Sequence, residues 1–183
     1  MLSICPNPKC RSHIIENMLE EEGLTVKPGS RKLERADGRN HQVMFQKFGR
    51  SLEIKEDYME GDLWTGKSEW LENAIAKSQW QSVLAFALVG GESNVPRFFR
   101  VMIPALQENY GFTDDDLVFF REHLVADEVH GDIGATLLAE CAQTSMEKET
   151  ILEAVKIGAR SWWLLHELCD REMRKQMTAS QTQ

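Results

Sequence analysis

Three side chains that can bind a metal ion recur at helical spacing in the middle of the chain. They are His123, Asp127 and His130, in the segment His-Leu-Val-Ala-Asp-Glu-Val-His. Steps of four and then three residues return to the same face of an α-helix, so two imidazoles and one carboxylate should share one stripe. Histidine together with carboxylate is a ligand set that suits a hard-to-borderline metal ion.

The residues around this stripe indicate that it faces a protein core. The stripe continues an apolar row, Leu117, Phe120 and Leu124. The neighbouring charged residues fall on the other side of the helix: Arg121, Glu122 and Glu128. Burying an unpaired carboxylate costs roughly several kcal/mol unless a cation or a full hydrogen-bond network compensates it. A bound metal ion is the simplest compensation.

Other parts of the chain offer further candidate ligands. Glu92 follows a double glycine inside an otherwise apolar run, His41 opens an expected helix, and the glutamates at 20–22 end another. With the stripe, they make three histidines and three carboxylates, the inventory of a two-metal site in a helical bundle. From the residues alone, an isolated glutamate near a helix end is more often a solvated charge.

The spacing of apolar residues predicts an all-α bundle. The expected helices cover about residues 9–22, 41–48, 68–89, 95–108 and 147–177, together with a metal-motif helix that is capped by Thr113. Gly131 and Gly134 allow a bend or close packing before a helix that runs to about Ala142. The polar stretch from Leu24 to Arg39 is expected to be a loop, and no strand pattern is found.

Length and composition predict one helical domain over residues 1–183, with 1–9 as an extension and 178–183 as a frayed tail. The 183 residues are 42% hydrophobic and carry a formal charge of −8. This charge argues against nucleic acid or an anionic membrane as a partner. No membrane-spanning run or signal peptide is found, so a cytoplasmic location is expected.

Four cysteines and two further histidines are expected to be structural. Cys5 and Cys10 have no second pair that would complete a zinc site, and the other cysteines are Cys141 and Cys169. Their apolar helical surroundings favour ordinary thiols. His13 is expected to be a surface or partly buried residue of the first helix, and His166 is expected to be a core or boundary histidine with satisfied hydrogen bonds.

Longer segments around these residues resemble a known family. Gly91-Glu92-Ser-Asn-Val-Pro96 and Phe119-Phe120-Arg-Glu-His123-Leu-Val-Ala-Asp127-Glu-Val-His130 resemble the haem-oxygenase-like diiron oxidases, which include CADD-type proteins and alkene-forming fatty-acid decarboxylases. Asn17-Met-Leu-Glu20-Glu21-Glu22-Gly23 is similar to that family's Asn-Leu-x-x-Glu-x-Gly helix end, and Gly38-Arg39-Asn40-His41 is similar to the start of its next helix. The resemblance covers about residues 10–175.

The resemblance implies six metal ligands: Glu21, His41, Glu92, His123, Asp127 and His130. Glu21 is chosen because it stands four residues after Asn17 and two before Gly23. Because residues 24–37 separate it from His41 like an insertion, three other glutamates stay open as the first ligand: Glu20, Glu22 and Glu34.

The resemblance also implies a haem-oxygenase-like bundle, but two opening helices of the family have no counterpart before residue 10. Either the sequence starts late or another subunit covers that side, and a homodimer is therefore expected. The implied cofactors are two Fe²⁺ ions, with O2 as co-substrate for the oxidation of a small organic molecule; manganese stays open as the metal.

Two alternative functions are a metal-free oxidase similar to pyrroloquinoline-quinone synthase and a non-enzymatic metal-binding or protein-interaction module. The synthase-like proteins carry arginine where this chain has His123, and a histidine there favours a metal. A thiaminase-like activity would need a cysteine nucleophile, which the apolar positions of Cys141 and Cys169 do not favour.

Overall fold

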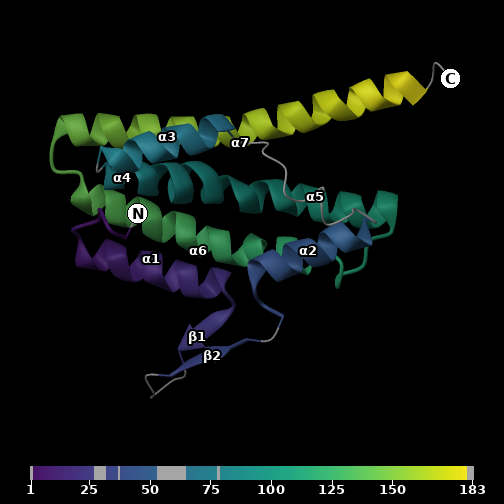
Figure 1. The fold of residues 1–183 in the computed structure, drawn as a ribbon, viewed down its shortest axis with the longest axis horizontal. Coiled ribbons are helices and arrows are strands. Elements are labelled where there is room, and N and C mark those ends of the chain that lie inside the picture. Colours follow the sequence, from purple (N-terminus) through teal and green to yellow (C-terminus); the bar gives the residue numbers. More distant parts are fainter. Residues whose placement is uncertain (1, 27–31, 37, 53–64, 78, 181–183) are drawn as a thin grey trace.

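The computed structural model describes residues 2–26, 32–36, 38–52, 65–77 and 79–180. These residues form the expected helical bundle, with one small hairpin (Figure 1). The elements in chain order are α1 (Pro8–Glu21), β1 (Leu24–Val26), β2 (Leu33–Arg35), α2 (His41–Ser51), α3 (Thr65–Ala76), α4 (Trp80–Leu84), the π-helix η2 (Ala85–Gly91), the 3-10 turn η3 (Glu92–Asn94), α5 (Val95–Tyr110), α6 (Val118–Cys141) and α7 (Ser145–Ser180).

Helix α6 lies at the centre of this bundle. It packs against η2 and α5 on one side and contacts α1 and α2 on the other, while α7 covers η2 and α4 (Figure 1). Two apolar clusters sit near its two ends: one contains Leu117 and Phe120, and the other contains Leu138 and Ala142. The stripe from His123 to His130 therefore lies between two apolar clusters, as its spacing predicts.

The helix expected over 68–89 is interrupted. It is divided into α3, α4 and η2, and Ile75 in α3 is exposed although the apolar spacing of this segment would place it in the core. In η2 the hydrogen bonds reach one residue further than in an α-helix, a distortion that is frequent beside functional sites. The distortion lies where η2 crosses α7 with almost no side chain between the two backbones. A Cβ on Gly90 would lie 2.6 Å from the carbonyl oxygen of Val155, and one on Gly158 would clash with the carbonyl oxygen of Phe86.

The segment expected to be a loop contains an antiparallel hairpin instead. Leu24 pairs with Arg35 and Val26 with Leu33. The side chains of β2 are exposed, and each strand has only three residues, too few for an alternating pattern to mark a strand in the sequence. Backbone hydrogen bonds hold the two strands together, and the hairpin lies below the helices in Figure 1.

The start of α6 and the end of α7 also differ from the prediction. Helix α6 starts at Val118, and Thr113 instead closes the preceding turn: its backbone N–H donates to Asp116 Oδ2 at 2.8 Å, and its Oγ1 accepts from the Asp116 N–H at 3.3 Å. The helix continues unbroken through Gly131 and Gly134, so the structure shows the close packing that was one of the two expected alternatives: a Cβ on Gly131 would clash with Ser93 Oγ, and one on Gly134 would lie 2.9 Å from Leu88 Cβ. Helix α7 includes residues 178–180 of the expected tail; residues 181–183 lie outside the described part.

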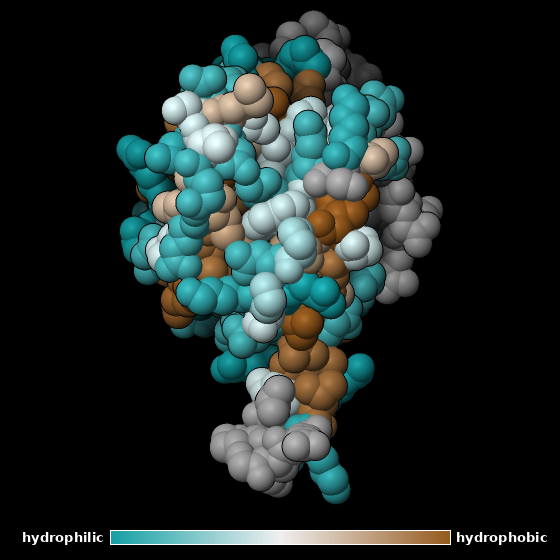
Figure 2. All heavy atoms as spheres, turned by 90° about the vertical axis from the view of Figure 1, so that its left-hand side faces the viewer, coloured by the Kyte–Doolittle hydropathy of each residue, from teal (hydrophilic) through white to brown (hydrophobic). Residues whose placement is uncertain are grey.

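The beginning of the chain is part of the core. Cys5 is buried, and Leu2 packs against the same apolar cluster. Within the described residues, no helix is both long and apolar enough to cross a membrane. On the end of the molecule seen in Figure 2, apolar patches alternate with polar surface, and apolar side chains gather where the hairpin leaves the helices.

The crossing of η2 and α7 predicts that two adjacent glycine substitutions differ in their effect on stability. Gly90→Ala should lower the free energy of unfolding by about 1–3 kcal/mol, because its methyl group must push the α7 backbone away. Gly91→Ala is the matched control, since its Cβ would meet the carbonyl oxygen of Phe86 at an ordinary 3.5 Å. Urea unfolding should show a clear loss for the first variant only; equal stabilities would mean that this crossing is not tightly packed.

Candidate metal centre

The structure gathers the six predicted ligands into two groups. Glu21, His41 and His123 form what we call the first cluster, and Glu92, Asp127 and His130 form the second cluster. In each, one ligand atom from each residue lies within 4.8 Å of the others. Helix α6 supplies His123 to the first cluster and Asp127 and His130 to the second, so the two clusters lie along one helix face.

In the first cluster, two histidine rings and one carboxylate meet at the end of α1. His41 Nδ1 lies 2.8 Å from Glu21 Oε2, and the centroids of the His41 and His123 rings are 4.3 Å apart. His123 Nδ1 lies 2.8 Å from the carbonyl oxygen of Phe119, which can only accept a hydrogen bond. The proton of a neutral His123 is therefore on Nδ1, and Nε2 keeps its lone pair for a metal ion.

The hairpin explains how Glu21 and His41 meet despite the residues between them. Gly23, just after α1, has a φ of 64°, which glycine adopts without strain. A Cβ there would lie 2.6 Å from the backbone nitrogen of Asn40, so the two ends of the insertion touch. Asn40 then caps α2 by accepting from the Val43 N–H at 3.0 Å, which places His41 at the first helical position.

Three consecutive glutamates have three different partners. Glu20 Oε2 lies 3.0 Å from His130 Nε2, Glu21 contacts His41, and Glu22 Oε2 accepts from Asn40 Nδ2 at 3.2 Å. Glu34 lies in the exposed strand β2 and belongs to neither cluster of the described chain. Of the four alternatives that the sequence left open, the geometry favours Glu21.

The second cluster is the more deeply buried one. The exposed fractions of its side chains are 3% for Asp127, 6% for His130 and 28% for Glu92. His130 Nδ1 lies 3.5 Å from Glu92 Oε2 and 3.8 Å from Asp127 Oδ1. Because Nε2 of the same ring faces Glu20, Nδ1 is the nitrogen that points into the cluster. Asn17 Nδ2 also lies 3.0 Å from this Nδ1.

Buried polar atoms without hydrogen bonds indicate that these residues fit a cation. Glu92 Oε2, Asp127 Oδ2 and His41 Nδ1 are buried and have no hydrogen-bond partner among the described residues. Although His41 Nδ1 is close to Glu21, its direction does not suit a hydrogen bond. Each such atom normally carries a penalty of about 1–3 kcal/mol, which coordination to a metal ion would remove.

The charges of the two clusters also indicate that positive charge is needed at these residues. Contacts with Asp127 and Glu92 raise the pKa of His130 to about 10, against the opposing effect of its burial. Burial raises the pKa of Glu92, and the charge of Asp127 adds to this rise. Burial lowers the pKa of His41, but contact with Glu21 outweighs it, so the net shift is upward. Protons thus offset the carboxylates wherever a metal ion does not.

His13 is a residue that the sequence analysis placed wrongly. It is buried, its Nε2 has no hydrogen-bond partner among the described residues, and its ring centroid lies 5.9 Å from that of His130. Burial, followed by the charge of His130, lowers its pKa. The signal was present: His13, Asn17 and Glu20 repeat the steps of four and three that mark His123, Asp127 and His130.

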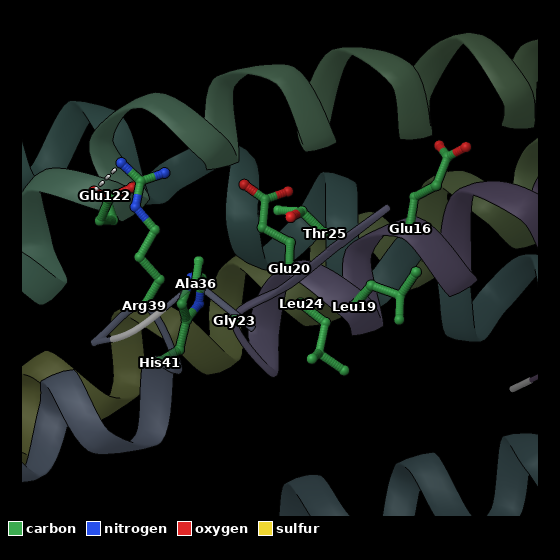
Figure 3. Close-up of a pocket in the computed structure, with 10 residues that line it drawn as sticks. All are labelled: Glu16, Leu19, Glu20, Gly23, Leu24, Thr25, Ala36, Arg39, His41 and Glu122. Atoms are coloured by element: carbon green, nitrogen blue, oxygen red, sulfur yellow. Dashed lines mark ion pairs between the residues drawn. The ribbon is translucent and has the colours of Figure 1, made fainter. Parts of the chain in front are cut away.

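Two of the cavities that border the clusters lie on different sides of them. The first, of about 300 Å³, lies between α1, the hairpin and α6 and is lined by His41 and Glu20 (Figure 3). Two further lining residues, Arg39 and Glu122, form an ion pair at 3.7 Å (Figure 3). The second, of about 240 Å³, lies between α3, η2 and α7 and is mostly apolar: Leu71, Phe86, Ala87, Gly91, Glu92, Val95, Gly158, Ser161 and Trp162.

Comparison with known families agrees with this bundle. Residues 1–163 match the model of the family described as iron-containing redox enzymes. The chain therefore belongs to this haem-oxygenase-like family, as its motifs predict. A comparison with curated proteins gave no match.

The different partners of the three glutamates predict different effects on metal binding. Glu21→Gln should strongly reduce iron bound by the first cluster, because it removes the only carboxylate charge of that cluster. Glu22→Gln is the matched control, since its partner is Asn40. Iron content and circular dichroism of both purified variants would test this; an equal loss of iron would contradict the choice of Glu21.

Proposed function

We propose that this protein is a non-haem diiron oxidase that uses O2 to oxidise a small organic substrate. The observation that carries the proposal is the pair of three-residue clusters along one face of α6, each combining carboxylate and imidazole around atoms that lack other partners. Membership in a family of iron-containing redox enzymes supports iron as the metal.

The residues of the two clusters would hold the metal ions. Glu21, His41 and His123 would bind one ion, and Glu92, Asp127 and His130 would bind the other. Two ferrous ions bound there would supply electrons for the reduction of O2. Their combined charge of +4 exceeds the charge of −3 on the three carboxylates, so the histidines can bind as neutral imidazoles.

The surrounding residues keep the histidines in the orientation that metal binding needs. The Phe119 carbonyl holds the proton of His123 on Nδ1, and Glu20 holds the proton of His130 on Nε2. The metal-facing nitrogens are then Nε2 of His123 and Nδ1 of His130. Such partners also make the imidazole a stronger ligand.

The apolar cavity beside Glu92 is suited to the substrate. Its walls include Phe86, Val95 and Trp162, while Glu92 connects it to the second cluster. Ser161 Oγ, a polar group of the lining, donates to the carbonyl oxygen of Ile157 at 2.8 Å. An apolar wall of this kind excludes water and holds an uncharged part of a substrate next to the metal ligands.

The expected homodimer stays a prediction. Helix α6 presents an exposed apolar row, Val125, Val129 and Ile133. These residues are spaced by four on the face away from the core, and a second subunit could cover them.

The proposal predicts about two irons per chain and rapid O2 consumption by the ferrous protein. Asp127→Ala should lose iron from the second cluster, because removing its carboxylate leaves excess positive charge in a buried site. Glu92→Gln keeps the shape of the side chain and should slow the reaction with O2 more than it affects folding. Metal analysis measures the iron content of each variant, and an oxygen electrode measures its O2 consumption. Full iron loading of Asp127→Ala would refute the site, and two bound irons without O2 consumption would favour the non-enzymatic alternative.

A second prediction concerns Glu20 as the residue that positions His130. Glu20→Ala should weaken iron binding to the second cluster by about 10–100-fold, since the tautomer and ring orientation of His130 are no longer held. Glu20→Gln should recover part of this loss, because an amide oxygen also accepts from Nε2. Glu16→Gln, exposed on the same helix, is the control. Anaerobic iron titration would give these affinities; unchanged binding in Glu20→Ala would rule the role out.

A further inference from the structure

Three of the four cysteines gather where α1 begins and α6 ends. Cys10 Sγ lies 3.9 Å from Cys141 Sγ, although 131 residues separate them in the sequence. Cys5 lies in the same apolar cluster, with its Sγ directed at the Asn7 carbonyl oxygen at 3.7 Å. Cys169, by contrast, is exposed on α7, which corrects the expectation that it lies in an apolar surrounding. The pair is about 16 Å along α6 from His130, at 1.5 Å per residue.

The surroundings of Cys10 and Cys141 give them different reactivities. Cys141 is partly exposed, whereas Cys10 is fully buried. Asn7 Nδ2 donates to Cys141 Sγ at 3.0 Å, and the Asn7 side chain is itself held by the backbone N–H groups of Lys9 and Cys10. Asn7 thus places a hydrogen-bond donor beside the more accessible of the two sulfur atoms. Burial, and then the neighbouring Cys141, raise the pKa of Cys10 to about 12, so Cys10 stays a thiol.

We propose that Cys10 and Cys141 form a disulfide when the protein meets hydrogen peroxide, with Cys141 reacting first. The Cys141 thiolate attacks one peroxide oxygen, the O–O bond breaks and hydroxide leaves, so Cys141 becomes a sulfenic acid. Cys10 sulfur then attacks the Cys141 sulfur. The S–O bond breaks, the S–S bond forms, and the Cys10 proton leaves with the hydroxyl group as water. The two thiols lose two electrons, and the peroxide takes them up.

Contact between the two sulfur atoms favours this second step. A buried thiol is a weak nucleophile, but a partner already in contact reacts as if its concentration were very high. The disulfide would tie α1 to α6, the two helices that carry Glu21, His123, Asp127 and His130. The reaction needs no metal ion, so it stands apart from the proposed oxidase activity.

Peroxide treatment of the full-length chain, with a metal chelator present, tests the proposal. Thiol titration under denaturing conditions should fall from four to two groups per chain, and peptide mapping should find Cys10 linked to Cys141. A reducing agent should restore all four thiols. The oxidised chain should unfold at a higher temperature, because the link closes a long loop.

Single serine variants distinguish the thiol that reacts with peroxide, Cys141, from the thiol that then forms the disulfide, Cys10. Cys10→Ser should leave a sulfenic acid on Cys141 that dimedone traps, and Cys141→Ser should leave Cys10 reduced. Cys169→Ser is the control and should form the link as the natural chain does. The proposal is overturned if peroxide leaves both Cys10 and Cys141 free to alkylate, or if a bridge between Cys5 and Cys10 or between chains is the main product.

Discussion

The need for positive charge inside the bundle is the constraint on which the rest of this structure depends. Asp127 is almost fully buried, Glu92 is largely buried, and each has an oxygen without a hydrogen-bond partner in the described chain. An apolar core would not tolerate two such groups side by side. Protonated histidines can offset them, as the raised pKa of His130 shows, and metal ions can do so more completely. The polar strip along α6 is therefore stable only if cations accompany it.

Two backbone contacts far from each other in sequence hold the ligands where that charge is needed. At one side, glycines let η2 touch α7, and this π-helix ends directly before Glu92. At the other side, Gly23 meets the backbone of Asn40, and the hairpin closes so that Glu21 and His41 face each other. In both places the absence of a side chain allows the approach. Small residues thus position the charged ones.

Helix α1 connects the metal centre to the thiol pair. Its C-terminal end carries Glu20 and Glu21, its middle carries His13 and Asn17 beside His130, and its first turn holds Cys10 against Cys141. The same helix face thus runs along α6 from one site to the other. A change in the crossing of these two helices would be felt by both sites, since packed interiors transmit strain.

The sequence by itself determined the elements whose signals are local. The four-plus-three spacing of His123, Asp127 and His130 marks a helix face, and the apolar periodicity marks an all-α fold, because both follow from 3.6 residues per turn. Its motifs also led to the family. Only the tertiary structure decided which glutamate faces which histidine: Glu20, Glu21 and Glu22 have the same chemistry, and one residue along a helix turns a side chain by about 100°. It also decided that His13 is buried and that Cys10 touches Cys141, since contacts across more than a hundred residues depend on how helices pack and leave no local signal.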